Sequence, residues 1–196
     1  MRLDRNRNLF VALIFGSLAA LVLCAAVKAQ ASTEIIPSVG LTRSVDTDAA
    51  KSEVGLALRG SMIPSVLDIE LKGQYRKQDE LGGQLTEHMW PVTASLYLTP
   101  LRVLYAGGGV GWYHTTLDYN PPLTLPNETH QKFGVHASAG VRVPVASALA
   151  LDLNGRYTWL ENQETATIPN KFNPDFWDMS LGLAFRFSGG GHHDRD

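Results

Sequence analysis

Cysteine is almost absent from this chain of 196 residues: the one cysteine, Cys24, lies within the first thirty residues. The rest of the chain therefore cannot form an internal disulfide, and burial, strand pairing or membrane insertion must stabilise it. Long apolar runs are also rare after residue 27, while 18 glycines are spread along the chain. This composition argues against a bundle of helices.

Clustered positive charge is lacking as well. The chain has 17 Lys and Arg against 19 Asp and Glu, which gives a net charge of −2 at pH 7. Without residues 1–31, which hold three arginines, one lysine and one aspartate, the net charge falls to about −5. Binding to nucleic acid requires basic patches, so we do not expect nucleic acid as a partner.

The N-terminus has the pattern of an export signal. Three arginines within the first seven residues precede an uncharged run over residues 9–27, and Ala29-Gln30-Ala31 then provides a small-x-small cleavage pattern. We expect residues 1–31 to be a cleaved signal peptide, with Ser32 as the new N-terminus. The remaining length suits a single domain.

Two alternatives concern the same segment. Its uncharged run approaches the roughly 20 residues that span a bilayer, so it could remain as an uncleaved anchor. Cys24 could carry a lipid, but the residue before a lipidated cysteine is normally small, and here it is Leu23. We therefore favour cleavage.

Apolar and polar residues alternate along most of the remaining chain. In residues 148–159, for example, Leu151 and Leu153 alternate with Asp152 and Asn154. A period of two predicts a strand with one apolar and one polar face. The pattern is weakest in the first segment, which contains Pro37. It predicts eight strands, over residues 34–43, 53–59, 67–76, 90–98, 104–113, 135–143, 148–159 and 177–187.

The predicted connections alternate in length. Those at residues 61–65, 99–101 and 144–147 are short, whereas those at 77–86, 115–130 and 160–175 are long and polar; the connection at 44–50 is intermediate. Short turns at one end and long loops at the other are typical of an antiparallel up-and-down barrel in an outer membrane. We expect one barrel domain over residues 32–187 and a flexible Gly/His tail over residues 188–196.

The tryptophans indicate which face is outside. Trp90 and Trp177 follow long connections and Trp112 and Trp159 precede them, all on the apolar face. Tryptophans at one predicted height are explained by an aromatic girdle at a membrane interface. Each lies about ten residues from a short turn or chain end, and ten residues at ~3.3 Å, tilted by ~40°, rise roughly 25 Å, the height of an apolar band.

The polar face carries charges of both signs, which would be costly in lipid, at about 2–4 kcal/mol for each Arg or Lys at mid-height. Inside a narrow eight-stranded barrel they can pair and fill the lumen. The charged set comprises Glu53, Arg59, Asp68, Glu70, Lys72, Arg76, Arg142, Asp152, Arg156, Asp178 and Arg186. The alternative is a soluble periplasmic barrel of the lipocalin type, which has its apolar residues inside. The Gly-x-Trp motif of that soluble family, near the mature N-terminus, is missing from this chain.

The segment Asp175-Phe176-Trp177-Asp178-Met179-Ser180-Leu181-Gly182-Leu183-Ala184-Phe185-Arg186-Phe187 resembles a closing strand of the small outer-membrane barrels of the OmpA/OmpX type. Residues 105–112, with four glycines, and residues 134–142 are similar to that family as well. The resemblance implies an eight-stranded transmembrane barrel in the bacterial outer membrane, inserted by the barrel-assembly machinery. One departure is that residues 188–196 follow Phe187, whereas the assembly signal is normally terminal.

His136, Ser138 and Asp152 are candidate catalytic residues. They lie on the same face of neighbouring predicted strands and could form a hydrolase triad. A His-x-Ser pair resembles part of the pattern of outer-membrane lipid A deacylases. The predicted lumen position would keep lipid away, so we expect hydrogen bonding inside the barrel instead.

His192-His193-Asp194 could bind metal, but they follow three glycines in a tail. Four glycines over residues 107–111 lack the lysine of a phosphate loop, and we expect close packing or a bend inside the barrel there.

The sequence thus predicts a protein without catalytic, metal or cofactor residues. Its barrel would anchor long outer loops for envelope structure, or for adhesion and surface interaction through residues 115–130 and 160–175. A wide pore is disfavoured because eight strands leave space only for side chains. Expected partners are outer-membrane lipid and lipopolysaccharide, the assembly machinery and an unidentified surface ligand. The alternatives are a lipid A-modifying enzyme and the soluble barrel.

Overall fold

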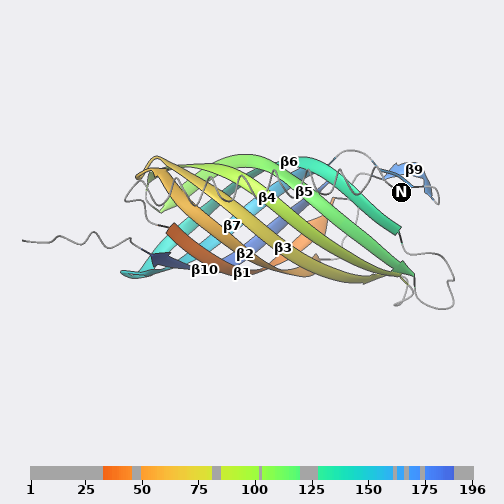
Figure 1. Cartoon of the computed structure of the whole chain (residues 1–196), viewed down its shortest axis with the longest axis horizontal. Coiled ribbons are helices and arrows are strands. Elements are labelled where there is room, and N and C mark those ends of the chain that lie inside the picture. The colour runs from red at the N-terminus through yellow and green to blue at the C-terminus, as the bar shows by residue number, and fades with distance from the viewer. Residues whose placement is uncertain are drawn as a thin grey trace, which may run out of the picture.

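The computed structural model is a closed antiparallel β-barrel with steeply tilted strands (Figure 1). It describes residues 33–45, 50–80, 85–101, 103–119, 128–160, 163–165, 168–172 and 175–187. The predicted signal peptide and the predicted tail, residues 1–31 and 188–196, lie outside these ranges. In the described part of the chain, no helix is long and apolar enough to cross a membrane.

Eight strands form the barrel, in the spatial order β1-β10-β7-β6-β5-β4-β3-β2, and β2 pairs with β1 to close it. The predicted eight-stranded up-and-down barrel is therefore confirmed. The barrel strands are β1 (Thr33–Ser44), β2 (Ala50–Ile63), β3 (Leu67–Glu80), β4 (Leu85–Leu101), β5 (Leu104–Tyr119), β6 (Glu128–Ala146), β7 (Leu149–Leu160) and β10 (Phe176–Phe187). A separate hairpin of β8 (Gln163–Thr165) and β9 (Ile168–Phe172) lies between β7 and β10 in the chain.

The alternating pattern places polar side chains inside the barrel and apolar side chains outside. On β7, Asp152 and Asn154 are buried in the lumen, whereas Leu151 and Leu153 are exposed on the outer wall. The same parity holds on β10, where Asp178 is buried and Met179 is exposed. A lipocalin-type barrel has the opposite arrangement, so that alternative is wrong.

Three tryptophans stand on the outer wall as the sequence predicts. Trp90, Trp159 and Trp177 have exposed fractions of 52%, 45% and 38%. Trp112 has the same parity and is half-buried, with its ring 5.5 Å from that of His114. As predicted, all four tryptophans lie on the outward face of their strands. That they lie at one height in the membrane stays a prediction.

At one end of the barrel the connections are short, and each contains a register shift. The shifts lie between Ser61 and Ile63, between Leu98 and Leu101, and between Pro144 and Ala146. The strands there extend into the residues predicted as turns, because an irregular residue bends the strand without ending its pairing. The turns are therefore displaced by a few residues from their predicted positions.

At the other end, all described residues of two predicted loops are strand. Residues 77–80 and 85–86 belong to β3 and β4, and residues 115–119 and 128–130 belong to β5 and β6. The predicted loop over residues 160–175 contains the β8–β9 hairpin. The prediction failed because alternation reports a face in contact with lipid. Where neither face of the sheet packs against an apolar phase, the alternation ends while the backbone pairing continues.

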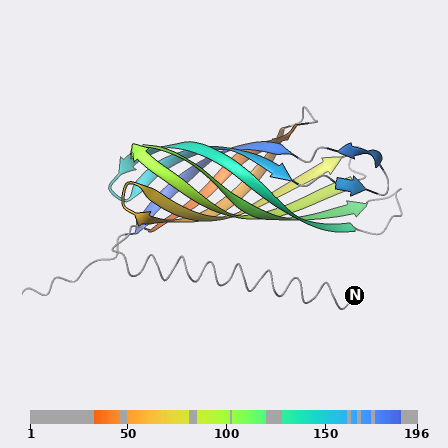
Figure 2. The same ribbon diagram turned by 90° about the horizontal axis from the view of Figure 1, so that it is seen from above.

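These extensions form a four-stranded projecting sheet, made of residues 77–80, 85–88, 114–119 and 128–133, which reaches beyond β1, β2, β7 and β10 (Figures 1 and 2). Its two outer strands have no barrel neighbour there: pairing of β3 with β2 ends at Arg76, and pairing of β6 with β7 ends at Gly134. The projecting sheet therefore has two open backbone edges within the described residues.

Candidate functional site

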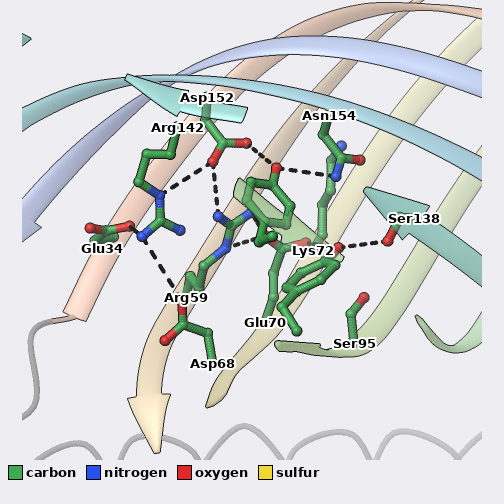
Figure 3. Close-up of polar contacts among 12 residues, drawn as sticks. Glu34, Arg59, Asp68, Glu70, Lys72, Ser95, Ser138, Arg142, Asp152 and Asn154 are labelled. Carbon is green, nitrogen blue, oxygen red and sulfur yellow. Dashed lines mark hydrogen bonds and ion pairs between the residues drawn. The ribbon is translucent and has the colours of Figure 1, made fainter. Parts of the chain in front are cut away.

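The centre of the lumen is organised around Arg59. Its Nε and Nη2 donate to Oε2 of Glu70 at 2.9 and 2.6 Å, and its Nη1 donates to Oδ2 of Asp152 at 2.8 Å (Figure 3). The guanidinium also lies over the rings of Tyr105 and Tyr97, 4.5 and 5.1 Å from their centroids. Two carboxylates and two aromatic faces thus compensate one buried cation.

Tyr105 links this centre to the neighbouring strands. Its hydroxyl donates to Oδ1 of Asp152 at 2.6 Å and accepts from Nδ2 of Asn154 at 3.1 Å. A Cβ atom at Gly140 would overlap the Tyr105 ring, so only glycine fits beside it. At Gly107 and Gly109 a Cβ atom would collide with the β4 backbone. The predicted close packing of the glycine segment is therefore confirmed.

A second group of charges closes the short-turn end of the lumen. Arg142 places Nη1 3.1 Å from Oε2 of Glu34 and 3.9 Å from Oδ2 of Asp68 (Figure 3). Arg186, whose side chain is 40% exposed at the rim, donates to Oε1 of Glu34 at 3.0 Å. The charges that the sequence assigned to the polar face therefore meet inside the barrel, as predicted.

The loop-side half of the lumen is less completely paired. Arg156 donates through Nη1 to Oγ1 of Thr93 at 3.1 Å, and Lys72 donates to Oγ of Ser180 at 3.1 Å. Glu53 accepts from Gln74 at 2.8 Å. In contrast, Asp178 is 1% exposed, and neither of its carboxylate oxygens has a hydrogen-bond partner within the described residues.

Two apolar clusters complete the filling of the lumen. The first, made of Ile36, Ala57, Ala150 and Ala184, lies toward the short turns, and the second, made of Met89, Tyr113, Leu160 and Phe176, lies toward the loops. The guanidinium of Arg76 lies 4.7 Å from the Phe176 ring centroid. Between Arg59 and Asn154 there is a cavity of only about 10 Å³, the space of about one water. The described lumen is therefore packed with side chains.

The candidate catalytic residues do not form a triad. Oγ of Ser138 donates to the hydroxyl of Tyr97 at 3.1 Å, and Nε2 of His136 lies 2.9 Å from Oγ of Ser95. Asp152 is engaged by Arg59 and Tyr105, as described above. His136 is 4% exposed and faces the lumen, so a lipid substrate has no access to it. The predicted role in internal hydrogen bonding fits this arrangement.

One polar cluster on the outer wall was missed by the sequence reasoning. The hydroxyl of Tyr75 lies 2.9 Å from Nδ1 of His88, whose Nε2 lies 3.4 Å from Oδ2 of Asp118. The Tyr75 ring also packs on Trp90, with centroids 4.3 Å apart. The signal was available, because His88 shares the parity of Trp90 and therefore lies just beyond the girdle, on its loop side.

No group of three or more His, Cys, Asp or Glu side chains that could hold a metal ion occurs in the described ranges. The tail residues His192, His193 and Asp194 lie outside those ranges, so their metal-binding role is not tested.

Comparison with known proteins identifies the family. The family model described as "Outer membrane protein beta-barrel domain" matches residues 15–187. The chain belongs to this family. Its exposed apolar wall is accordingly the surface of a transmembrane barrel, and the protein is located in the bacterial outer membrane. No curated protein matches this member of the family.

Solved structures agree with this fold. Neisserial surface protein A has a TM-score of 0.60 at 15% identity, with 81% of this chain and 98% of that chain covered. Ail of Yersinia pestis, solved with the heparin analogue sucrose octasulfate, has a TM-score of 0.54 at 14% identity, covering 80% and 98%. The N-terminal barrel domain of Pseudomonas aeruginosa OprF scores 0.52 at 14% identity, covering 80% and 97%. At these identities the similarity concerns the fold alone.

Proposed function

We propose that this outer-membrane barrel is a closed anchor that presents the projecting sheet and its loops outside the cell for surface interaction or adhesion. The observation that carries the proposal is the filled lumen: paired charges and two apolar clusters occupy it, and the central cavity has about 10 Å³. A lumen of this kind supports a role at the barrel ends. The long connections face outward in this proposal, as is usual for such barrels.

The charge of the loop end suggests the kind of partner. Residues 44–50, 77–88, 115–132 and 160–175 contain ten Asp and Glu but only three Lys and no Arg. An acidic surface attracts cationic partners and repels polyanions. The structure of Ail with a heparin analogue concerns a polyanion bound to that protein. For this chain, the charge of the loop end favours a basic protein surface instead.

A binding measurement tests this proposal. The full chain in phospholipid nanodiscs is passed over immobilised polylysine and immobilised heparin at low and physiological salt. We expect salt-sensitive binding to polylysine and none to heparin. Replacing Lys77 and Lys132 with glutamine should strengthen polylysine binding, whereas replacing Asp118 and Glu128 with Asn and Gln should weaken it. Binding to heparin that exceeds binding to polylysine would contradict the proposed partner class.

A conductance measurement tests the closed lumen. In planar bilayers, the reconstituted chain should show no sustained open channel, because the side chains that fill the lumen, including the apolar clusters around Ile36 and Phe176, leave an ion no continuous water path. A steady open conductance from the folded protein would instead favour a pore function and would contradict the anchor proposal.

Further hypotheses concern lipid chemistry, insertion into the membrane and the lipid around the barrel. A lipid A-modifying activity has no accessible catalytic set around His136, and an unchanged lipid A profile in cells producing His136→Ala would count against it. Insertion by the barrel-assembly machinery would use β10, which ends at Phe187 with alternating apolar residues. Outer-membrane lipid and lipopolysaccharide are the proposed surroundings of the wall.

A further inference from the structure

An apolar groove of about 680 Å³ lies in the outer wall and crosses β4, β5, β6, β7 and β10. Its floor is a row of directly paired small residues, Ala106, Ala139 and Gly155. The same row ends in larger side chains, with Leu98 paired to Ala106 on one side and Met179 paired to Gly155 on the other. The groove is therefore a hollow between two apolar ridges.

The hollow is not required by the packing of the barrel itself. A Cβ atom built at Gly155 meets only the carbonyl oxygen of Ala139, at 3.9 Å, so a larger side chain would project outward into free space. Ala106 and Ala139 are exposed on the same wall. On the short-turn side the groove is bordered by Leu104, exposed in part on the outer wall. Small residues here thus remove bulk from the outer surface and leave the lumen unaffected.

The lining offers hydrocarbon and almost no polar group. Apart from glycines, its residues are Leu98, Pro100, Leu104, Tyr105, Ala106, Ala139, Val141, Leu153 and Met179. The one hydroxyl among them, that of Tyr105, is directed into the lumen, where it bonds to Asp152 and Asn154. A ligand of this groove therefore has to be hydrocarbon, since the lining provides no donor or acceptor for a head group.

We propose that the groove holds one acyl chain of a phospholipid, in preference to the rest of the wall. The groove is continuous with the outer wall, which in a protein of the outer membrane is already in contact with hydrocarbon. A chain lying in a hollow has protein atoms on several sides, whereas a chain on a convex wall has them on one side, and dispersion contacts add up with each neighbour.

A second copy of the chain fits the groove less well. In a two-fold dimer the same surface patch faces itself, so a pair centred here would set hollow against hollow. The two empty volumes would then face each other without being filled, which loses the close packing that stabilises protein interfaces. A flexible chain adapts to the hollow from one side and leaves no such void.

Native mass spectrometry of the full chain tests the proposal. The protein is folded into vesicles of dioleoylphosphatidylcholine, extracted in a mild detergent and examined for retained phospholipid. Gly155→Leu fills the groove, and Gly73→Leu is the matched control, because Gly73 is an exposed glycine with no atom within 4 Å of its built Cβ. Ala106→Leu is a second groove-filling variant, to be used if Gly155→Leu does not fold. Folding is judged from the shift in gel mobility between unboiled and boiled samples.

We expect one phospholipid to be retained by the wild type and by Gly73→Leu, and at least a fivefold lower retained fraction in the folded groove-filling variant. Equal retention in all variants would overturn the proposal, as would a wild type that retains no phospholipid. A dimer that is present in the wild type and lost in the filling variants would assign the groove to a second copy instead. None of these outcomes depends on the loop partner, so they leave the proposed surface function to its own tests.

Discussion

Buried charges at the centre of the lumen and on its loop side are compensated differently. At the centre, Arg59 holds Glu70 and Asp152 at hydrogen-bond distance, with two tyrosine rings against its guanidinium. Near the loops, Asp178 is buried just as deeply, yet within the described residues its oxygens accept no hydrogen bond. Burial alone therefore does not indicate how much a charge stabilises the barrel. The geometry of its partners decides this.

The difference matters because side chains fill the lumen and its central cavity has only about 10 Å³. A charge inside has little access to bulk water, so a lost partner is not replaced easily. We expect substitutions around Arg59 to be costly and substitutions of Asp178 to be tolerated. Three measurements test this comparison, each by urea unfolding in phospholipid vesicles, with the folded fraction read from gel mobility of unboiled samples.

The largest effect is expected for Arg59→Leu. The change removes the only cation within hydrogen-bond distance of both Glu70 and Asp152 in the described lumen and leaves them with arginines at 3.6 Å. Breaking a buried ion pair in this way costs about 3–5 kcal/mol of unfolding free energy. The matched control is Arg186→Leu, because Arg186 is 40% exposed and pairs with Glu34 at the rim. Its loss should be below about 1 kcal/mol. Equal losses in the two variants would contradict the central role of Arg59.

An intermediate effect is expected for Tyr105→Phe. The substitution keeps the ring beside Arg59 but removes one hydrogen bond to a carboxylate and one from Asn154, at 2.6 and 3.1 Å. Loss of hydrogen bonds to charged groups costs about 1.5–3 kcal/mol. Tyr75→Phe on the outer wall serves as the control, since the Tyr75 hydroxyl contacts His88 where water competes. If Tyr75→Phe lost as much stability as Tyr105→Phe, hydrogen bonds in the lumen would contribute no more to stability than those on the outer wall.

The alternation of the sequence was sufficient to predict which residues share the lumen, but not which of them meet. Asp152 was placed on the polar face from its neighbours Leu151 and Leu153, because parity is a local property. Its contact with Arg59 joins residues 93 positions apart and crosses the interior between strands that are not paired with each other. Such contacts depend on barrel closure and strand stagger, which no local pattern encodes.

In the projecting sheet, by contrast, the sequence pattern did not predict the strands themselves. Residues 115–119 and 128–130 form strand in β5 and β6, although their sequence has the polar character of a loop. Hydrophobic patterning reports contact with an apolar phase, so it is silent where both faces of a sheet meet water. The outer-wall groove was missed for a related reason: Ala106, Ala139 and Gly155 become neighbours only once the register of three strands is known.

The smallest effect is expected for Asp178→Asn. Neither carboxylate oxygen has a hydrogen bond to lose in the described structure, so the change removes only longer-range attraction to the neighbouring cations. We expect a loss below about 1 kcal/mol, whereas Asp152→Asn, which disturbs bonds to Arg59 and Tyr105, should cost about 1.5–3 kcal/mol. If Asp178→Asn proved as damaging as Asp152→Asn, ordered water would have to bond to Asp178 in the folded protein. Asp178 would then be as well satisfied as Asp152, by solvent instead of by side chains.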